Sequence, residues 1–64
     1  MTKLEKEFIE ACDKFLEESR LGPAIDARDD VEASLDGLTS EHPEFRGKSA
    51  GYVYNKLKEN KGGM

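Results

Sequence analysis

The sequence predicts an all-α fold, a small three-helix domain with a short turn between its second and third helices. Apolar residues recur at helical spacing in three separate stretches of the chain. Gly22-Pro23, Gly37 and Gly47 fall between those stretches, at places where helices commonly end. Residue types that favour strands gather only at 52–54, and no second run is available to pair with them.

The first helix is expected at residues 2–20. Thr2 and Glu5 fit a capping box, in which the Thr hydroxyl accepts from the backbone N–H of Glu5 and the Glu side chain reaches back. Gly22 and Pro23 then stop the helix. One apolar stripe follows the 3.6-residue period, and it consists of Leu4, Phe8, Ala11, Cys12 and Phe15.

The second helix is expected at residues 24–36, opened by Pro23 and ended by Gly37. Its apolar side holds Ala24, Ala27, Val31, Leu35 and Leu38. Its other side carries Asp26, Asp29, Asp30, Glu32 and Asp36. Acidic residues early in a helix suit the positive end of its dipole, which supports this assignment.

A short helical turn through Glu41 and His42 is expected next, capped by Thr39 or Ser40, with Phe45 anchoring the connection to the core. Ser49 can cap a third helix, whose inner face is formed by Ala50, Val53, Tyr54 and Leu57. A strand at 52–54 is the alternative, but the helical stripe continues to Leu57. Residues 1–60 are therefore expected to form one domain, and residues 61–64 a flexible tail.

The composition leaves room for only a thin core. A chain of 64 residues is one small domain, and such a domain buries about 60% of its unfolded surface. The expected core members are Leu4, Phe8, Ile9, Cys12, Phe15, Leu16, Leu21, Ile25, Val31, Leu35, Leu38, Phe45, Val53, Tyr54 and Leu57. Stability is therefore expected to be a few kcal/mol or to depend on association.

Several function classes fit the sequence poorly. No apolar run is long enough for a membrane span, charged residues occupy the place of a signal peptide, and a cytoplasmic location is expected. Cys12 and His42 are too few ligands for a zinc site, and the acids from Asp26 onward lack EF-hand spacing. Cys12 is expected to be a small buried apolar residue and His42 a surface residue. We expect no catalytic residue, no metal, no cofactor and no enzymatic activity.

Charge is unevenly distributed along the chain. Residues 1–42 hold twelve acidic and five basic side chains, a balance of −7, while residues 43–64 hold two and five, a balance of +3. An acidic surface attracts basic partners at long range. The leading prediction is a non-enzymatic interaction module, such as a phage-encoded inhibitor or accessory regulator, that binds a basic surface of a larger protein. A homo-oligomer that joins basic end to acidic face is a further expectation. The expected contact residues are Glu10, Glu17, Asp29, Asp30 and Glu32.

The alternative prediction is a small DNA-binding regulator. Segment 39–60 resembles a helix-turn-helix, with a short helical turn, a Gly-containing turn and a helix that begins after Ser49. The side chains expected to reach nucleic acid are Arg46, Lys48, Tyr52, Asn55 and Lys56. Pro43 inside the first helical turn and the acidic balance of the chain weigh against this interpretation.

Overall fold

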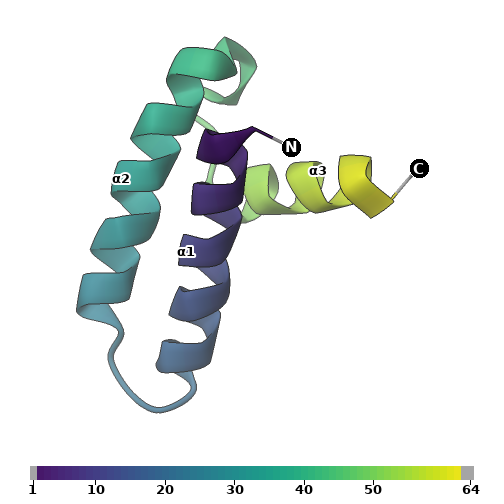
Figure 1. The fold of residues 1–64 in the computed structure, drawn as a ribbon. Helices are drawn as coiled ribbons and strands as arrows, with labels where there is room; N and C mark the ends of the chain where they lie inside the picture. Colours follow the sequence, from purple (N-terminus) through teal and green to yellow (C-terminus); the bar gives the residue numbers. More distant parts are fainter. Residues whose placement is uncertain (1, 63–64) are drawn as a thin grey trace.

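The computed structural model describes the backbone of residues 2–62 and the side chains of residues 2–59. It contains α1 (Lys3–Ser19), α2 (Ile25–Glu41), the 3-10 turn η1 (Pro43–Phe45) and α3 (Ala50–Gly62). Figure 1 shows α1 and α2 side by side as an antiparallel hairpin, with α3 beginning beside α1 and projecting away from the hairpin. No strand occurs within residues 2–62, and Tyr52, Val53 and Tyr54 are helical. The predicted all-α, three-helix fold is confirmed.

The capping box of α1 is present as predicted. The Thr2 hydroxyl accepts from the Glu5 N–H at 3.3 Å, and Glu5 Oε1 accepts from the Thr2 N–H at 2.8 Å. Two N–H groups that the first helical turn leaves without partners are thereby satisfied. At the other end the chain leaves the helix after Arg20, and Gly22 takes a φ of +155° in the turn.

The second helix differs from the prediction at both ends. It begins at Ile25, two residues after Pro23, and no side chain caps it. It also continues through Gly37 to Glu41, because Leu38 beyond the glycine is fully buried. Burying a leucine stabilises by about 1.5–3 kcal/mol, which outweighs the cost of about 1 kcal/mol for a helical glycine.

The expected separate turn at 39–42 is therefore absent. Thr39 and Ser40 do not cap a new element; their hydroxyls donate back to the carbonyl oxygens of Asp36 and Gly37, at 2.7 and 2.6 Å. This back-bonding keeps both side chains within the last turn of α2. The short turn begins instead at Pro43, where a missing N–H costs nothing.

The connection to α3 follows the prediction more closely. Phe45 is 8% exposed and belongs to the core. Gly47 has a φ of +77° in the turn that follows. The Ser49 hydroxyl accepts from the Tyr52 N–H at 3.2 Å, which makes Ser49 the cap of α3. The helix reaches Gly62, so residues 61 and 62 are helical, while residues 63 and 64 of the expected tail lie outside the described residues.

The core joins all three helices. Its buried members are Phe8, Cys12, Val31, Leu38, Phe45, Val53 and Leu57, with Leu4, Ile9, Phe15, Leu35 and Tyr54 packed against them. Ala27, which is only 1% exposed, was absent from the predicted core. Three predicted core residues are exposed instead: Leu16 (52%), Leu21 (87%) and Ile25 (68%). Figure 1 gives the reason, since α3 lies beside the part of α1 that is distant from the loop joining α1 to α2, and so leaves the loop end of the hairpin uncovered.

Candidate functional site

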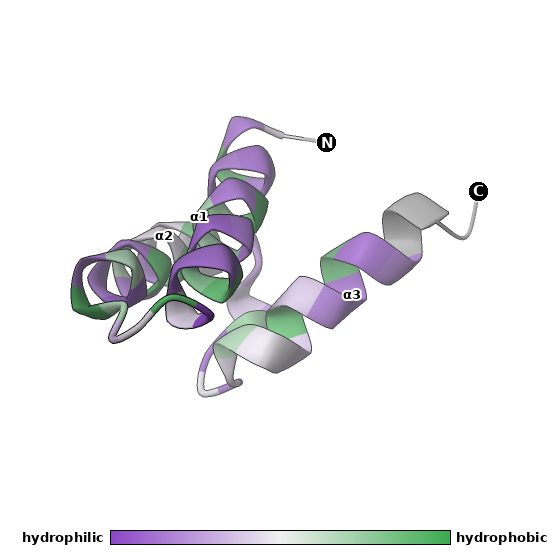
Figure 2. Ribbon diagram, turned by 90° about the horizontal axis from the view of Figure 1, so that it is seen from below, coloured by the Kyte–Doolittle hydropathy of each residue, from purple (hydrophilic) through white to green (hydrophobic). Residues whose placement is uncertain are grey.

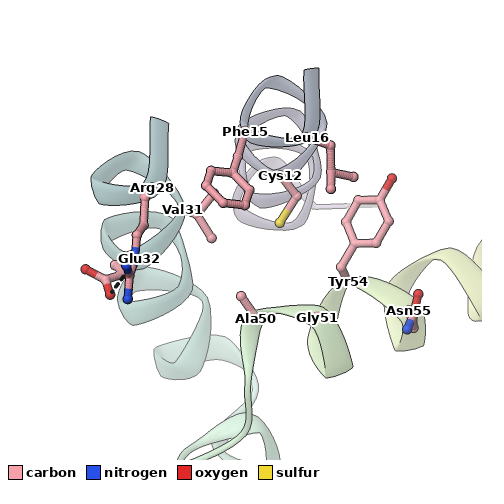
Figure 3. A pocket seen from close by; sticks show the side chains of 10 residues that line it. All are labelled: Cys12, Phe15, Leu16, Arg28, Val31, Glu32, Ala50, Gly51, Tyr54 and Asn55. Atoms are coloured by element: carbon pink, nitrogen blue, oxygen red, sulfur yellow. Dashed lines mark ion pairs between the residues drawn. The ribbon is translucent and has the colours of Figure 1, made fainter. Parts of the chain in front are cut away.

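An apolar groove lies where the three helices meet, and we call it the junction groove. It encloses about 500 Å³, a size typical of ligand-binding clefts. Figure 3 shows that its lining residues come from all three helices, with Cys12, Phe15, Val31 and Ala50 around the central space. The lining residues are Cys12, Phe15 and Leu16 of α1, Arg28, Val31 and Glu32 of α2, and Ala50, Gly51, Tyr54 and Asn55 of α3. The small residues Ala50 and Gly51 keep the first turn of α3 from filling this space.

One wall of the junction groove is held by a bond between helices. The Tyr54 hydroxyl donates to Asp13 Oδ1 at 2.5 Å. This hydrogen bond, together with partial burial and the negative charge of Asp13, raises the pKa of Tyr54 to about 12. The phenol therefore stays neutral and in place over the whole physiological pH range.

The thiol of Cys12 lies against the same groove but has little nucleophilic character. Cys12 is 6% exposed, as predicted for a small apolar residue. Burial, followed by the charge of Asp13, raises the pKa of the thiol to about 11. Because the thiolate is the reactive form, this cysteine is suited to packing and not to attack on a substrate.

The rim of the junction groove on α2 is polar. Arg28 Nε lies 4.0 Å from Glu32 Oε1, and both side chains are mostly exposed, at 72% and 66%. An exposed pair of this kind contributes at most a few tenths of a kcal/mol. Both side chains can therefore turn toward a partner at little cost.

The five predicted acidic contact residues are exposed, as expected, but they do not form one surface. Glu10 and Asp30 line a shallow groove between α1 and α2, together with Glu7. Glu32 lies on the other side of α2, at the rim of the junction groove. Glu17 and Asp29 line neither groove. Within the described side chains, neither Asp29 nor Asp30 forms an ion pair, so no basic side chain of the chain neutralises these two charges at close range.

The five predicted nucleic-acid residues are also divided. Lys48 Nζ and Lys56 Nζ lie 5.5 and 5.6 Å from the ring centroid of Tyr52, which is 43% exposed. Asn55 faces the junction groove instead. Arg46 lies with Lys48 beside a third groove, which it shares with acidic residues of α2. Segment 39–60 is not a self-contained helix-turn-helix, because residues 39–41 end a 17-residue helix.

His42 occupies a position that the sequence did not predict. It was expected to be a surface residue, but its side chain is 27% exposed and lies between two carboxylates. Nε2 is 2.8 Å from Glu5 Oε2, and Nδ1 is 3.2 Å from Glu44 Oε2. Neither ring nitrogen is directed at Cys12. Acidic residues at positions 41 and 44 were a local signal for such pairing, but Glu5 is 37 residues away in sequence.

Within the described residues, no group of three His, Cys, Asp or Glu side chains is arranged to hold a metal ion. No helix within residues 2–62 combines the length and the apolar character that crossing a bilayer requires. Comparison of the chain with protein-family models, with curated proteins and with solved structures gave no match.

Proposed function

We propose that this chain is a non-enzymatic interaction module that binds a basic, amphipathic helix of a larger protein in its junction groove. The observation that carries this proposal is the exposure of an apolar side chain. Leu16 is 52% exposed at the edge of an apolar groove that the chain's own helices leave open. A module of this kind acts as an inhibitor or accessory regulator when it covers the basic surface of its partner.

Beyond the groove, the loop end of the hairpin exposes further apolar side chains. Leu16 lies in α1, Leu21 in the loop and Ile25 at the start of α2, and all three are more than half exposed. Figure 2 looks onto this end and shows hydrophobic segments on the loop and beside it. Exposed apolar residues that cluster in this way are typical of binding sites, whereas single ones are common on any surface.

Charge selects the kind of partner. Residues 1–42, a range that includes both helices of the hairpin, carry a net charge of −7. Glu32 lies on the rim of the junction groove beside Arg28, its exposed ion-pair partner, and Glu17 is an exposed neighbour of Leu16 in sequence. A helix that inserts apolar side chains into the groove and presents Lys or Arg on its flanks matches both properties. The attraction would mainly increase the association rate and would weaken with salt.

A defined peptide tests this proposal. A synthetic amphipathic helix with Leu on one face and Lys on the other is titrated into labelled protein, and amide shifts are mapped by NMR. We expect shifts at the residues of the junction groove and an affinity that falls with salt. The same peptide with Glu in place of Lys should bind far more weakly. Equal affinity for the two peptides, or shifts away from the groove, would refute the proposal.

A set of variants separates apolar from electrostatic contributions to binding. Leu16→Glu should abolish binding while circular dichroism stays unchanged, because Leu16 is half exposed. Glu32→Lys and Glu59→Lys change the net charge equally, but only Glu32 lines the groove. Glu32→Lys should therefore weaken binding more than Glu59→Lys does.

Reversal of Asp29 and Asp30 to Lys should slow association and flatten its salt dependence. Light scattering on the free protein shows whether a second copy fills the groove instead.

Nucleic acid is a second candidate partner, favoured by the arrangement around Tyr52. An exposed aromatic ring between two ammonium groups offers a stacking surface beside phosphate contacts. Titration with mixed-sequence duplex at low salt tests this candidate. Lys48→Ala and Lys56→Ala should each reduce the slope of log affinity against log salt by about one. Absence of binding at low salt would exclude it.

A further inference from the structure

The imidazole of His42 joins three elements of the fold. It lies at the end of α2 and contacts Glu5 of α1 at 2.8 Å and Glu44 of η1 at 3.2 Å. We call these three residues the His42 clamp. The side chain of Glu5 is only 15% exposed, so the contact between α1 and His42 is partly shielded from water.

The geometry of the His42 clamp requires a charged ring. Both ring nitrogens face carboxylate oxygens, which only accept hydrogen bonds. A neutral imidazole has one N–H and can donate to only one of the two. The other nitrogen would then direct a lone pair at a carboxylate, so loss of the proton must break or weaken one contact.

The clamp is connected to the start of α1 and to the core. Glu5 also accepts the Thr2 N–H at 2.8 Å, and the Thr2 hydroxyl donates to Glu41 Oε1 at 2.8 Å. The His42 ring packs on Phe45, with 5.2 Å between ring centroids. A change at His42 therefore reaches both the cap of α1 and the residue that anchors η1.

We propose that the His42 clamp is a pH-sensitive latch, which ties the first turn of α1 and η1 to the end of α2 while His42 is an imidazolium and loses one of its two carboxylate contacts when His42 is neutral. The groups that face the ring are Glu5 from α1 and Glu44 from η1. Glu41 of α2 adjoins His42 in sequence but is engaged by Thr2.

The direction of the pH dependence follows from the charges. Partial burial opposes the imidazolium, but the hydrogen bonds and charges of Glu44 and Glu5 outweigh it and raise the pKa of His42 above its ordinary 6.5. A raised histidine pKa means that the stabilisation is complete below the unfolded-state pKa. The stabilisation is then lost as the pH rises through the higher pKa of the folded protein.

An NMR titration tests the clamp directly, because His42 is the only histidine in the chain. The ring resonance of the full chain should titrate above the ordinary range. Glu5→Gln, which keeps an acceptor for Thr2, and Glu44→Gln, at an exposed position, should each lower the titration midpoint. Glu41→Gln is the matched control and should leave it nearly unchanged. An ordinary midpoint in the wild type, or one that neither variant lowers, would overturn the latch.

A second measurement addresses stability. The folding equilibrium constants of wild type and His42→Gln are compared by urea unfolding from about pH 5 to about pH 9. Their ratio should fall by about fivefold across this range, the equivalent of one lost hydrogen bond. A ratio that stays constant with pH, while the resonance titrates, would show that the ring changes charge without losing a contact that stabilises the fold, and would also overturn the latch.

Discussion

The Tyr54 hydroxyl donates a hydrogen bond to Asp13 Oδ1, and this bond joins α3 to α1 across 41 residues of sequence. The acceptor is a carboxylate, so the bond is stronger than one between neutral groups. Together with the buried Val53 and Leu57, it positions α3 against α1, and it links one wall of the junction groove to the hairpin. The shape of the proposed binding site therefore depends on a contact outside the hydrophobic core.

Removal of this bond should have a measurable but limited effect. We expect Tyr54→Phe to lower the free energy of unfolding by about 1 kcal/mol, because the ring stays while the hydrogen bond is lost. The exposed ring of Tyr52 provides the control, and Tyr52→Phe should change stability by less than about 0.5 kcal/mol. Urea unfolding followed by circular dichroism measures both. Equal losses for the two variants would show that the bond does not contribute to stability.

The ionisation of Tyr54 provides an independent check. In a Tyr52→Phe background, Tyr54 is the only tyrosine, and its phenolate absorbance should appear with a pKa of about 12. Asp13→Asn should bring that pKa back toward 10.0, because it removes the hydrogen bond to a carboxylate, which is the main cause of the raised pKa, and with it the negative charge. Stability from this bond is present below the ordinary pKa and is lost as the pH rises through the higher one. Identical titration curves with and without the Asp13 charge would contradict this account.

Leu38 and Leu21 allow the same substitution to be compared in opposite environments. Leu38 is 0% exposed and Leu21 is 87% exposed. Leu38→Ala should cost about 2–5 kcal/mol, because it removes buried methyl groups and leaves a cavity. A domain this small has only a few kcal/mol of stability, so we expect this variant to be largely unfolded at room temperature.

Leu21→Ala should change the free energy of unfolding by less than about 0.5 kcal/mol. Thermal unfolding of both variants, monitored by circular dichroism, checks the contrast. A large loss for Leu21→Ala would mean that this residue is buried in solution. Such burial would place it in a contact with a second copy, and the loss would then depend on protein concentration.

Local patterns predicted the parts of this fold that depend on neighbours in sequence. The capping box of Thr2 and Glu5 and the cap at Ser49 are short-range hydrogen bonds, and both are present. The apolar stripe of the first helix follows the helical period and is buried at Phe8 and Cys12. The predicted helix end at Gly37 was wrong, because burial of Leu38 stabilises the helix by more than the glycine destabilises it.

The candidate sites could not be predicted in the same way. The exposure of Leu16 depends on where α3 packs along α1, and no local sequence pattern determines that contact. The pairing of His42 with Glu5 requires the start of α1 to lie beside the end of α2. The acidic surface was predicted correctly in its exposure, but its division between grooves depends on how α1 and α2 are rotated about their axes.

Gly37 and Gly47 should respond in opposite ways to replacement by alanine, because of the two only Gly47 has a positive φ. Gly37 has no positive φ, and a Cβ built there meets Leu4 Cδ2 at 3.8 Å, an ordinary van der Waals distance. Gly37→Ala should therefore stabilise the protein by about 0.5–1 kcal/mol through the helix propensity of alanine and a less flexible unfolded chain.

Gly47→Ala should do the reverse, although nothing lies within 4 Å of its Cβ position. Its φ of +77° places the new side chain against its own backbone, which costs about 1–2 kcal/mol. Urea midpoints of the two variants should therefore move in opposite directions from the wild type. If Gly37→Ala were destabilising, α1 and α2 would have to approach more closely at Leu4 than the structure shows. The shallow groove that holds Glu10 and Asp30 would then be narrower, since Leu4 and Gly37 both line it.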